Sequence, residues 1–257
     1  MRTVRTVADV RRELTGAVTV GLVPTMGGLH AGHRALFEAA RPACDVLVAS
    51  SFVNRPQFAY AADYVAYPND AAADAALAEA AGVDLLFAPA DDVMYPPGFA
   101  TWVEPEGAAL GLEGDHRPGH FRGVATVVLK LFTIVRPQIA WFGRKDAQQV
   151  AVVRQLVRDL ELQVEIRVVE TVRDVDGLAL SSRNARLSPA ERGRAVAIPR
   201  ALATRSEAAA RRILAEAGIE PDYVAVADLV GPTLAIAATI GTTRLIDNIP
   251  LEEGACA

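Results

Sequence analysis

The stretch VTVGLVPTMGGLHAGH, residues 18–33, joins an apolar run to two glycines and two closely spaced histidines. Its apolar, largely β-branched residues predict a strand over 18–24, which ends at a proline. Gly27 and Gly28 follow, and glycines let the backbone come close to a ligand. In parallel α/β sheets, ligands bind beyond the carboxyl ends of the strands. The stretch therefore predicts an α/β fold with a ligand site directly after this strand.

The two histidines of this stretch, His30 and His33, are three residues apart and would lie on one face of a helix. A helix beginning near His30 or Ala31 would direct its free N–H groups toward the same site, which suits an anion. Two imidazoles there could donate hydrogen bonds to phosphate oxygens and stabilise charge in a transition state. The spacing also suits a partial metal site or ordinary surface residues, so the pair alone leaves the function open.

Apolar runs and helical patterns alternate over the rest of the first 171 residues. Asp70 is the expected N-cap of one helix, and Gly82 is its expected stop. Buried strands that alternate with helices predict a parallel sheet covered on both faces, and hence a Rossmann-like domain over residues 1–171. Further strands are expected over 45–53, 83–89, 138–143 and 164–170, and helices over 69–82, 123–137 and 147–160.

The sequence changes character after residue 171. A turn is expected at Asp176–Gly177, and SPAERGRA begins a helix in which Ser188 and Glu191 form a capping box. An Ala- and Arg-rich helical stretch continues to about Ala217. Three short strands follow within DYVAVADL, TLAIAATIG and TTRLIDNIPLE. These patterns predict a small α+β domain over 172–257.

Composition excludes several classes of protein. The chain of 257 residues is 51% hydrophobic and 22% charged, as expected of a globular protein, and its net charge of −5 argues against a nucleic-acid-binding face. The longest apolar stretch, VATVVLKLFTIV, is too short to cross a membrane and contains Lys130. The charged start MRTVRTVADVRREL is unlike a signal peptide. Cys44 and Cys256 form no disulfide framework, which suits a cytoplasmic location.

Two further segments carry groups suited to phosphate. FGRKDAQQ, residues 142–149, follows an expected strand, and Lys145 could reach a phosphate as a mobile point charge. Asp146 and Gln149 in the same segment also fit a capping box, and both roles can hold together. LALSSRN, residues 178–184, contains two serines and an arginine whose donors match a polyphosphate, although such a run is often only a polar turn.

Two other segments carry polar side chains near expected helix or strand ends. SFVNRPQF contains Asn54 and Gln57, whose neutral amides suit a carboxylate or hydroxyl substrate but also suit turn chemistry. RPGHFRGVATVV contains Arg117, His120 and Arg122 before a helix. Cations are unfavourable at a helix start, which indicates a ligand-related reason, although a solvated surface explains them almost as well.

These motifs together resemble the pantoate–β-alanine ligase family, within the H-x-G-H nucleotidylyltransferase superfamily. The resemblance covers nearly the whole chain and implies a Rossmann-like parallel sheet domain with a small α+β C-terminal lid domain, in a cytoplasmic homodimer. The matching segments, in order, are PTMGGLHAGH, FVN..QF, YP, GVDLLFAP, RPGHFRGVATVV, FGRKD.QQ, VRDVDGLALSSRN.RLSP and GTTRLIDNI.

The resemblance implies a two-step ligation. ATP and pantoate would first give pantoyl adenylate and pyrophosphate, and the amine of β-alanine would then attack the activated carbonyl and release AMP. A carboxylate is a poor acyl donor, and adenylation supplies a good leaving group. Such an enzyme needs positioning and charge stabilisation, with Mg²⁺ on the phosphates, and no covalent nucleophile.

The resemblance also implies roles for residues at matching positions. His33 matches the histidine that acts as proton donor, and His30 would hold the adenylate phosphate. Lys145 and Arg183, on the phosphates, complete the implied catalytic set. Asp74 is what remains of an acidic pair and is the implied metal ligand. The implied ATP-binding residues are Met26, Gly27, Gly28, Leu29, His30, Ala31, Gly32, His33, Gly143, Arg144, Lys145, Asp146, Val172, Leu180, Ser181, Ser182 and Arg183, and the implied substrate-binding residues are Gln57, Gln149, Asn54 and Arg117.

The sequence departs from the family pattern near the implied acid and amine pockets. The departing residues are Arg55, Asn69, Ala73, Arg144 and Ala147, and the C-terminal domain is short. Three alternatives follow. A paralogue could join a different acid and amine, an adenylyltransferase could act on a phosphate acceptor, or a non-catalytic paralogue could bind nucleotide. Gln57 and Gln149 argue against a phosphate acceptor, which would favour additional cations, and the intact histidines argue against loss of catalysis.

Overall fold

The computed structural model describes residues 1–59 and 64–251, so Cys256 lies outside the described residues. The chain divides into two compact units. The first unit contains Met1–Phe142 and Val152–Val169, and the second contains Gly143–Ala151 and Glu170–Ala257. The change of unit after residue 169 lies close to the domain boundary expected at 171. The short segment 143–151, which a single boundary cannot represent, belongs with the later part of the chain.

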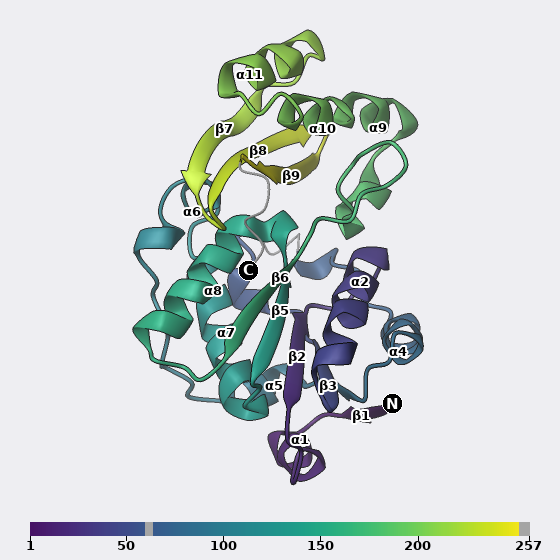
Figure 1. The fold of residues 1–257 in the computed structure, drawn as a ribbon, viewed down its shortest axis with the longest axis vertical. Coiled ribbons are helices and arrows are strands. Elements are labelled where there is room, and N and C mark those ends of the chain that lie inside the picture. Colours follow the sequence, from purple (N-terminus) through teal and green to yellow (C-terminus); the bar gives the residue numbers. More distant parts are fainter. Residues whose placement is uncertain (60–63, 252–257) are drawn as a thin grey trace. The chain divides into compact units, whose positions relative to one another are not determined.

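A six-stranded parallel sheet forms the centre of the first unit, in the order β1-β4-β3-β2-β5-β6 (Figure 1). The five strands expected from the sequence are all present. The additional strand β1 pairs with β4 through Arg2 and Leu85, and with three residues it is too short to carry a pattern. The strands are β1 Arg2–Val4, β2 Val20–Thr25, β3 Val46–Ser51, β4 Leu85–Phe87, β5 Ile139–Gly143 and β6 Glu165–Val169.

Helices cover both faces of this sheet, with α2 and α4 on one face and α7 on the other (Figure 1). The expected caps of α4 are confirmed in part, since the Asp70 side chain accepts a hydrogen bond from the Ala73 N–H. Helix α7 begins at His120, three residues before the expected start. The helices are α1 Val7–Glu13, α2 Ala31–Ala40, α4 Ala71–Ala80, α5 Asp91–Met94, α6 Glu113–His116, α7 His120–Val135 and α8 Ala147–Asp159, the last divided between the two units.

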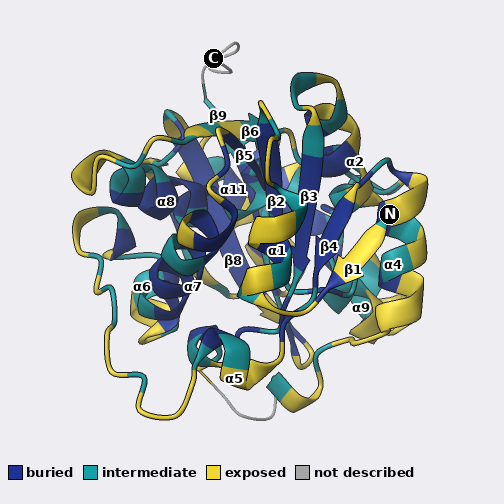
Figure 2. Cartoon of the chain, turned by 90° about the horizontal axis from the view of Figure 1, so that it is seen from below, coloured by how far each residue is buried: buried dark blue, intermediate teal, exposed yellow. Residues whose placement is uncertain are grey.

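The core of the first unit consists of strand residues and the helix residues that face them. Figure 2 shows the central strands in the dark blue of buried residues, whereas β1 is exposed. Leu22, Leu47 and Phe87 are fully buried in the sheet, and Phe37 of α2 is fully buried against it. Both faces of the central strands are therefore covered, which explains why these strands are continuous apolar runs in the sequence.

A three-stranded antiparallel sheet, in the order β7-β8-β9, forms the second unit together with the helices between residues 189 and 216. The helical stretch expected after Ser188 is confirmed but interrupted. Arg205 has a φ of 53°, and the next residue, Ser206, caps a new helix. The elements are α9 Pro189–Ala195, α10 Ala197–Leu202, α11 Glu207–Glu216, β7 Pro221–Asp228, β8 Pro232–Ile240 and β9 Thr243–Pro250.

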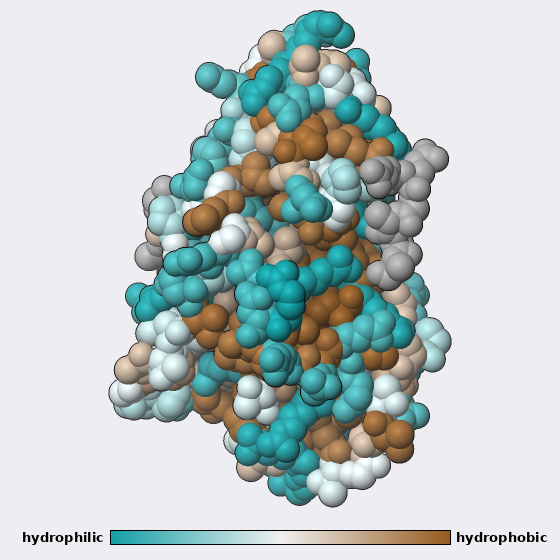
Figure 3. Space-filling view, turned by 60° about the vertical axis from the view of Figure 1, so that its left-hand side comes forward, coloured by the Kyte–Doolittle hydropathy of each residue, from teal (hydrophilic) through white to brown (hydrophobic). Residues whose placement is uncertain are grey.

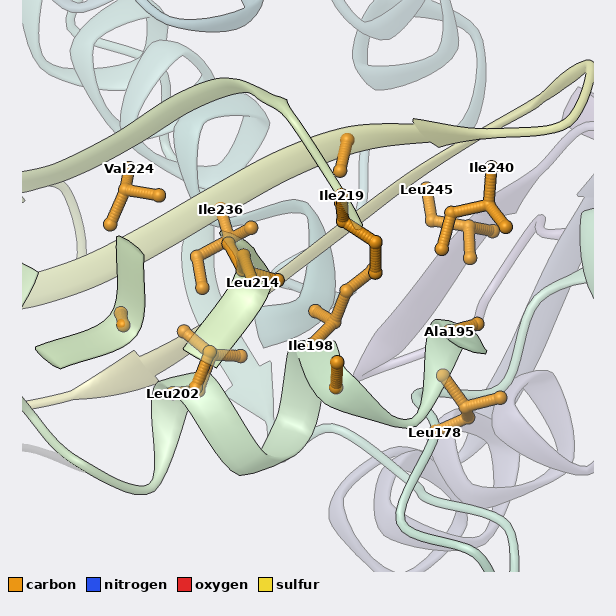
Figure 4. Packing of buried hydrophobic residues seen from close by; sticks show 14 of the residues in the cluster. Leu178, Ala195, Ile198, Leu202, Leu214, Ile219, Val224, Ile236, Ile240 and Leu245 are labelled. Atoms are coloured by element: carbon orange, nitrogen blue, oxygen red, sulfur yellow. The ribbon is translucent and has the colours of Figure 1, made fainter. Parts of the chain in front are cut away.

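The second unit has an apolar core of its own. Figure 4 shows Ile198 and Leu202 of α10 beside Leu214 of α11 and Ile236 of β8, and all four are buried. The expected turn at Asp176–Gly177 is present, because the Gly177 N–H donates to the Asp174 carbonyl over 2.9 Å. Each unit thus holds its functional segments on a separately packed framework.

Apolar residues are not confined to the interior. Figure 3 shows hydrophobic and hydrophilic residues interspersed over the face in view. Among the described residues, no helix has the length and apolar character needed to cross a membrane. The apolar run VATVVLKLFTIV belongs to α7, and most of its side chains are buried in the first unit.

Candidate active site

The glycine turn after β2 adopts a conformation that favours glycine at two successive positions. Gly27 and Gly28 have φ values of 83° and 62°, in the left-handed region where side chains are strained. A Cβ on Gly27 would also lie 2.8 Å from Oδ2 of Asp74. The turn leads into α2, whose N-cap is His30, so the helix start expected at this point is confirmed.

The two histidines form a capping box built from imidazoles. His30 Nδ1 accepts a hydrogen bond from the Gly32 N–H over 3.1 Å, and His33 Nδ1 accepts one from the His30 N–H over 3.2 Å. The ring centroids are 4.3 Å apart, which confirms that the pair shares one side of the helix. Because Nδ1 accepts in each ring, the proton of the neutral imidazole lies on Nε2. Both rings therefore carry an Nε2–H donor suited to an anionic oxygen.

Asp74, the implied metal ligand, faces the glycine turn from α4. Its Oδ1 accepts a hydrogen bond from the Leu29 N–H over 2.7 Å, and its Oδ2 accepts one from the Gly28 N–H over 2.9 Å. The residue is 3% exposed. Within residues 1–59 and 64–251, no group of three or more His, Cys, Asp or Glu residues is arranged to hold a metal ion. The geometry gives Asp74 a direct part in holding the turn, and its metal role stays a prediction.

Asn54 and Gln57 lie together at the end of β3, as the sequence predicts. The Asn54 Nδ2 donates to Gln57 Oε1 over 3.0 Å, and Gln57 Nε2 donates to Met26 Sδ over 2.9 Å. His120 is buried and its Nδ1 lies 2.9 Å from the Gln57 carbonyl, which can only accept, so Nδ1 carries the proton. Gln57 thereby connects the short 3-10 helix η2, Arg55–Gln57, to the glycine turn and to α7.

Arg117 is paired within its own segment. Its Nη1 lies 3.5 Å from Oε2 of Glu113, one turn earlier, and the Glu113 side chain is almost fully buried. The Arg117 guanidinium, at the end of α6, thus compensates the charge of the buried Glu113 carboxylate. Glu113 was not among the predicted site residues. Its pairing with Arg117 depends on the short helix α6, which has no pattern in the sequence.

The turn that carries Lys145 is held by a residue far along the chain. The short 3-10 helix η4, Arg144–Asp146, follows β5. Asn248 of β9 donates from Nδ2 to the carbonyls of Arg144 and Lys145, over 2.9 Å each. The Arg144 guanidinium is buried, with Nε 2.6 Å from Glu170 Oε1 and Nη1 3.3 Å from the Val230 carbonyl. Arg144 thus packs into the second unit. Asn248, which holds the Lys145 turn, was not among the residues predicted from the sequence.

A pocket in the second unit brings together several predicted phosphate ligands. Lys145, Ser181 and Arg183 line it, as the sequence predicts. Arg183 Nη1 donates to the Arg244 carbonyl over 3.4 Å, which orients its side chain. Among the other predicted residues, Val172 uses its carbonyl to accept from the Leu180 N–H over 2.9 Å. The remaining lining residues are Asn184, Arg244, Asp247, Leu178, Ala179, Ile198, Leu245 and Ile246.

Positively charged side chains outnumber negatively charged ones in the lining of this pocket. Its single lining carboxylate, Asp247, accepts two hydrogen bonds from Arg173, over 2.6 and 3.0 Å. Burial raises the pKa of Asp247, while Arg173 opposes that shift, and so does the nearby charge of Lys145. The Asp247 charge is largely committed to Arg173, and Arg244 pairs with Asp222 over 2.6 Å, so Lys145 and Arg183 are the cations that we assign to a ligand. That balance suits a polyphosphate.

Several of the departures from the family pattern lie at the surface. Arg55 and Asn69 are exposed, whereas Ala147 is buried at the start of α8. Lys145 Nζ lies 3.8 Å from Asp146 Oδ1, and the Asp146 side chain is 48% exposed. Gln149 lies in the first turn of α8, in the segment that groups with the second unit.

Comparisons with known proteins agree over the whole chain. The family model described as pantoate-beta-alanine ligase matches residues 1–250. The pantothenate synthetase of Chloroflexus aggregans is 48% identical, over 96% of this chain and 99% of its own length, and that of Rhizorhabdus wittichii is 50% identical, over 98% and 99%.

Solved structures agree with this result. Pantothenate synthetase from Thermus thermophilus is 48% identical, with a TM-score of 0.91 over 98% of this chain and 99% of its own. Pantoate-beta-alanine ligase from Francisella tularensis, solved in complex with "Beta-gamma ATP" and β-alanine, is 34% identical, with a TM-score of 0.88 over 99% of both chains. The resemblance noted in the sequence and the fold class are confirmed. This chain belongs to the pantoate–β-alanine ligase family.

Proposed function

We propose that this chain ligates pantoate to β-alanine in two steps that use the residues described above. ATP and pantoate give pantoyl adenylate and pyrophosphate, and the β-alanine amine then attacks the acyl carbon and expels AMP. The observation that supports this most directly is the imidazole capping box. It fixes two Nε2–H donors at the N-terminus of α2, beside a glycine turn. A helix N-terminus with added donors stabilises the charge that develops on a transferred phosphoryl group.

In the first unit, His30 and His33 serve as donors to the phosphate that is attacked, and His33 supplies the proton-donor role. Gly27 and Gly28 let the turn approach the nucleotide closely, with Asp74 holding that turn from behind. The other predicted nucleotide contacts in this unit come from Met26, Leu29, Ala31 and Gly32.

In the second unit, Lys145, Ser181 and Arg183 bind the departing phosphates, where negative charge accumulates as pyrophosphate leaves. Lys145 is the mobile charge of the set, and Arg183 supplies planar, bidentate donors. Arg144 contributes through its backbone, since its guanidinium is committed to Glu170. The further predicted contacts are Gly143, Asp146, Val172, Leu180 and Ser182.

The acid and amine are bound by neutral amides and one cation. Gln57 and Gln149 donate to oxygens of pantoate, and Arg117 faces the carboxylate end of the substrates. Asn54 has its amide protons and its oxygen engaged with protein groups, so it supports Gln57 rather than touching substrate. Holding both reactants in position supplies much of the rate enhancement for such a ligation.

Mg²⁺ would come with the triphosphate. The described residues offer it few ligands, because both oxygens of Asp74 accept backbone hydrogen bonds and Asp247 is paired with Arg173. Magnesium is commonly bound through substrate phosphates with one or two carboxylates, which matches this sparse set. We place the enzyme in the cytoplasm as a homodimer, by analogy with the family.

The test is the exchange of labelled pyrophosphate into ATP in the presence of pantoate. His33→Ala and Lys145→Ala each remove a preorganised donor, and we expect at least ~2–3 kcal/mol of lost transition-state stabilisation, a rate loss of roughly 30-fold or more. Arg34→Ala is the matched control, because Arg34 is exposed on the same helix and pairs with Glu38. Near-normal exchange in either test variant, with Arg34→Ala also normal, would show the assigned roles to be wrong.

A further inference from the structure

A chain of buried hydrogen bonds leads from Tyr95, which follows α5, to the glycine turn. The Tyr95 hydroxyl donates to Asn54 Oδ1 over 2.6 Å. Asn54 Nδ2 donates both to Gln57 Oε1 and to the Gly123 carbonyl, over 3.0 Å each. Gln57 Nε2 donates to Met26 Sδ over 2.9 Å. Asn54 is 1% exposed and Gln57 is 7% exposed, so protein groups determine how both amides are oriented.

One backbone carbonyl sets the direction of the whole chain. The Gly123 carbonyl can only accept, so the part of the Asn54 amide that faces it must be the NH₂ group. The second proton of that NH₂ group points to Gln57, whose facing atom must then be the acceptor Oε1. Asn54 Oδ1 is left to face Tyr95, whose hydroxyl must donate. Reversing either amide would place two acceptors or two donors against each other in a buried site, which is costly.

Glycine at position 123 makes this arrangement possible. A Cβ on residue 123 would lie 2.6 Å from the Gln57 backbone nitrogen, which is closer than Cβ atoms approach other heavy atoms in proteins. Helix α7 and η2 therefore approach each other backbone to backbone. That approach brings the Gly123 carbonyl within reach of Asn54, so the orientation of the amides depends on the packing of two elements distant in sequence.

We propose that Tyr95 is a positioning residue that fixes the Gln57 amide with its NH₂ group toward the acid substrate. The inference rests on the proposed function, in which Gln57 binds pantoate. A thioether sulfur is a weak acceptor, so the N–H held by Met26 is readily exchanged for a bond to an oxygen. The Gln57 NH₂ group is thus a donor that is oriented before the substrate binds. It selects acids that place an acceptor oxygen within its reach. Tyr95 contributes without touching substrate, because its hydroxyl holds the Asn54 amide in the orientation that the Gly123 carbonyl selects, and Asn54 in turn holds Gln57.

Tyr95→Phe removes the hydroxyl and keeps the ring, which stacks on Trp102 with centroids 5.8 Å apart and meets Phe99 edge-on. We expect the KM for pantoate in the exchange assay to rise about tenfold, the equivalent of one lost hydrogen bond of this kind. The KM for ATP and the kcat should stay within about twofold. A purely structural role would instead change all three quantities together. Tyr64→Phe is the matched control, because the Tyr64 hydroxyl makes a long, exposed hydrogen bond with Asp91, over 3.4 Å.

A double-mutant cycle tests whether Tyr95 acts through Gln57. In a Gln57→Ala background, Tyr95→Phe should leave the pantoate KM unchanged, because the group that it positions is gone. An equal rise in both backgrounds would overturn the proposal, and so would a Tyr95→Phe enzyme indistinguishable from Tyr64→Phe. If the unmodified enzyme catalyses no pantoate-dependent exchange, the proposed function fails as well. Exchange by the unmodified enzyme with a failed cycle overturns the Tyr95 inference alone.

Discussion

At the scale of single residues, the candidate site depends on polar atoms whose partners leave them one orientation. His30 and His33 each commit Nδ1 to a backbone N–H, so their tautomers follow from the helix start itself. Asp74 commits its two oxygens to the turn that precedes that start. The donors are therefore set by the backbone before any substrate binds, which is how an enzyme avoids reorganisation during the reaction.

A substitution can distinguish between two roles of Asp74, holding the glycine turn and binding a metal ion. Asp74→Asn replaces one acceptor oxygen with an NH₂ group that faces the Gly28 or Leu29 N–H. We expect a loss of about 1–3 kcal/mol in the free energy of unfolding, measured by chemical denaturation, together with a raised KM for ATP. Asp70→Asn is the control, because asparagine caps a helix as well as aspartate does. A variant of normal stability that requires more Mg²⁺ would assign Asp74 to the metal and contradict its role in the turn.

Residues that carry their chemistry in local motifs could be predicted from the sequence, whereas residues that act across the chain could not. His30, Lys145 and Arg183 stand in short, recognisable segments. Tyr95 and Asn248 do not, because their partners lie 41 and more than 100 residues away. A lone tyrosine or asparagine has no pattern that reveals such a partner. Only the packing of the elements brings these groups together.

At the scale of elements, the long, strongly patterned segments were predictable and the short ones were not. Continuous apolar runs identify β2, β3 and β5 because both faces of the sheet are covered. The three-residue β1 and the four-residue helices α5 and α6 offer no period to read. The capping box at the start of α9 was predicted from Ser188 and Glu191 alone, and both of its hydrogen bonds are present.

That capping box predicts a pH-dependent contribution to stability. Hydrogen bonds from the Ser188 backbone and hydroxyl lower the pKa of Glu191 below its usual 4.5. A carboxylate with a lowered pKa in the folded state stabilises the protein above its unfolded pKa, and this contribution is lost as the pH falls through the folded value. Glu191→Gln should therefore melt below the unmodified protein at pH 7, and the two melting temperatures should converge as the pH approaches 3. A constant difference across this range would contradict the assignment.

At the scale of the whole molecule, the chain builds two separately packed units from interleaved pieces of sequence. The Lys145 segment, residues 143–151, groups with the second unit although the chain returns to the first unit directly afterwards. No single boundary in the sequence separates the two units, because residues 143–151 are grouped with the second unit by their contacts with β9, about a hundred residues later. Each unit holds its own share of the groups assigned to the reaction.

The location of the departures from the family pattern also bears on which acid the enzyme activates. The departures at Arg55 and Asn69 are exposed, whereas Gln57 and Asn54 are buried and bonded to each other. Surface changes of this kind should leave the choice of acid with the buried amides. We therefore expect the family's substrates to be used in spite of these departures.

The most direct measurement is pyrophosphate–ATP exchange with the purified, unmodified protein, across a panel of acids that includes pantoate and analogues lacking one hydroxyl. We predict exchange that requires an acid, is fastest with pantoate, and is followed by release of AMP and an amide product when β-alanine is added. Preferred activation of a different acid, or transfer of AMP to a phosphate acceptor in place of amide formation, would contradict this prediction.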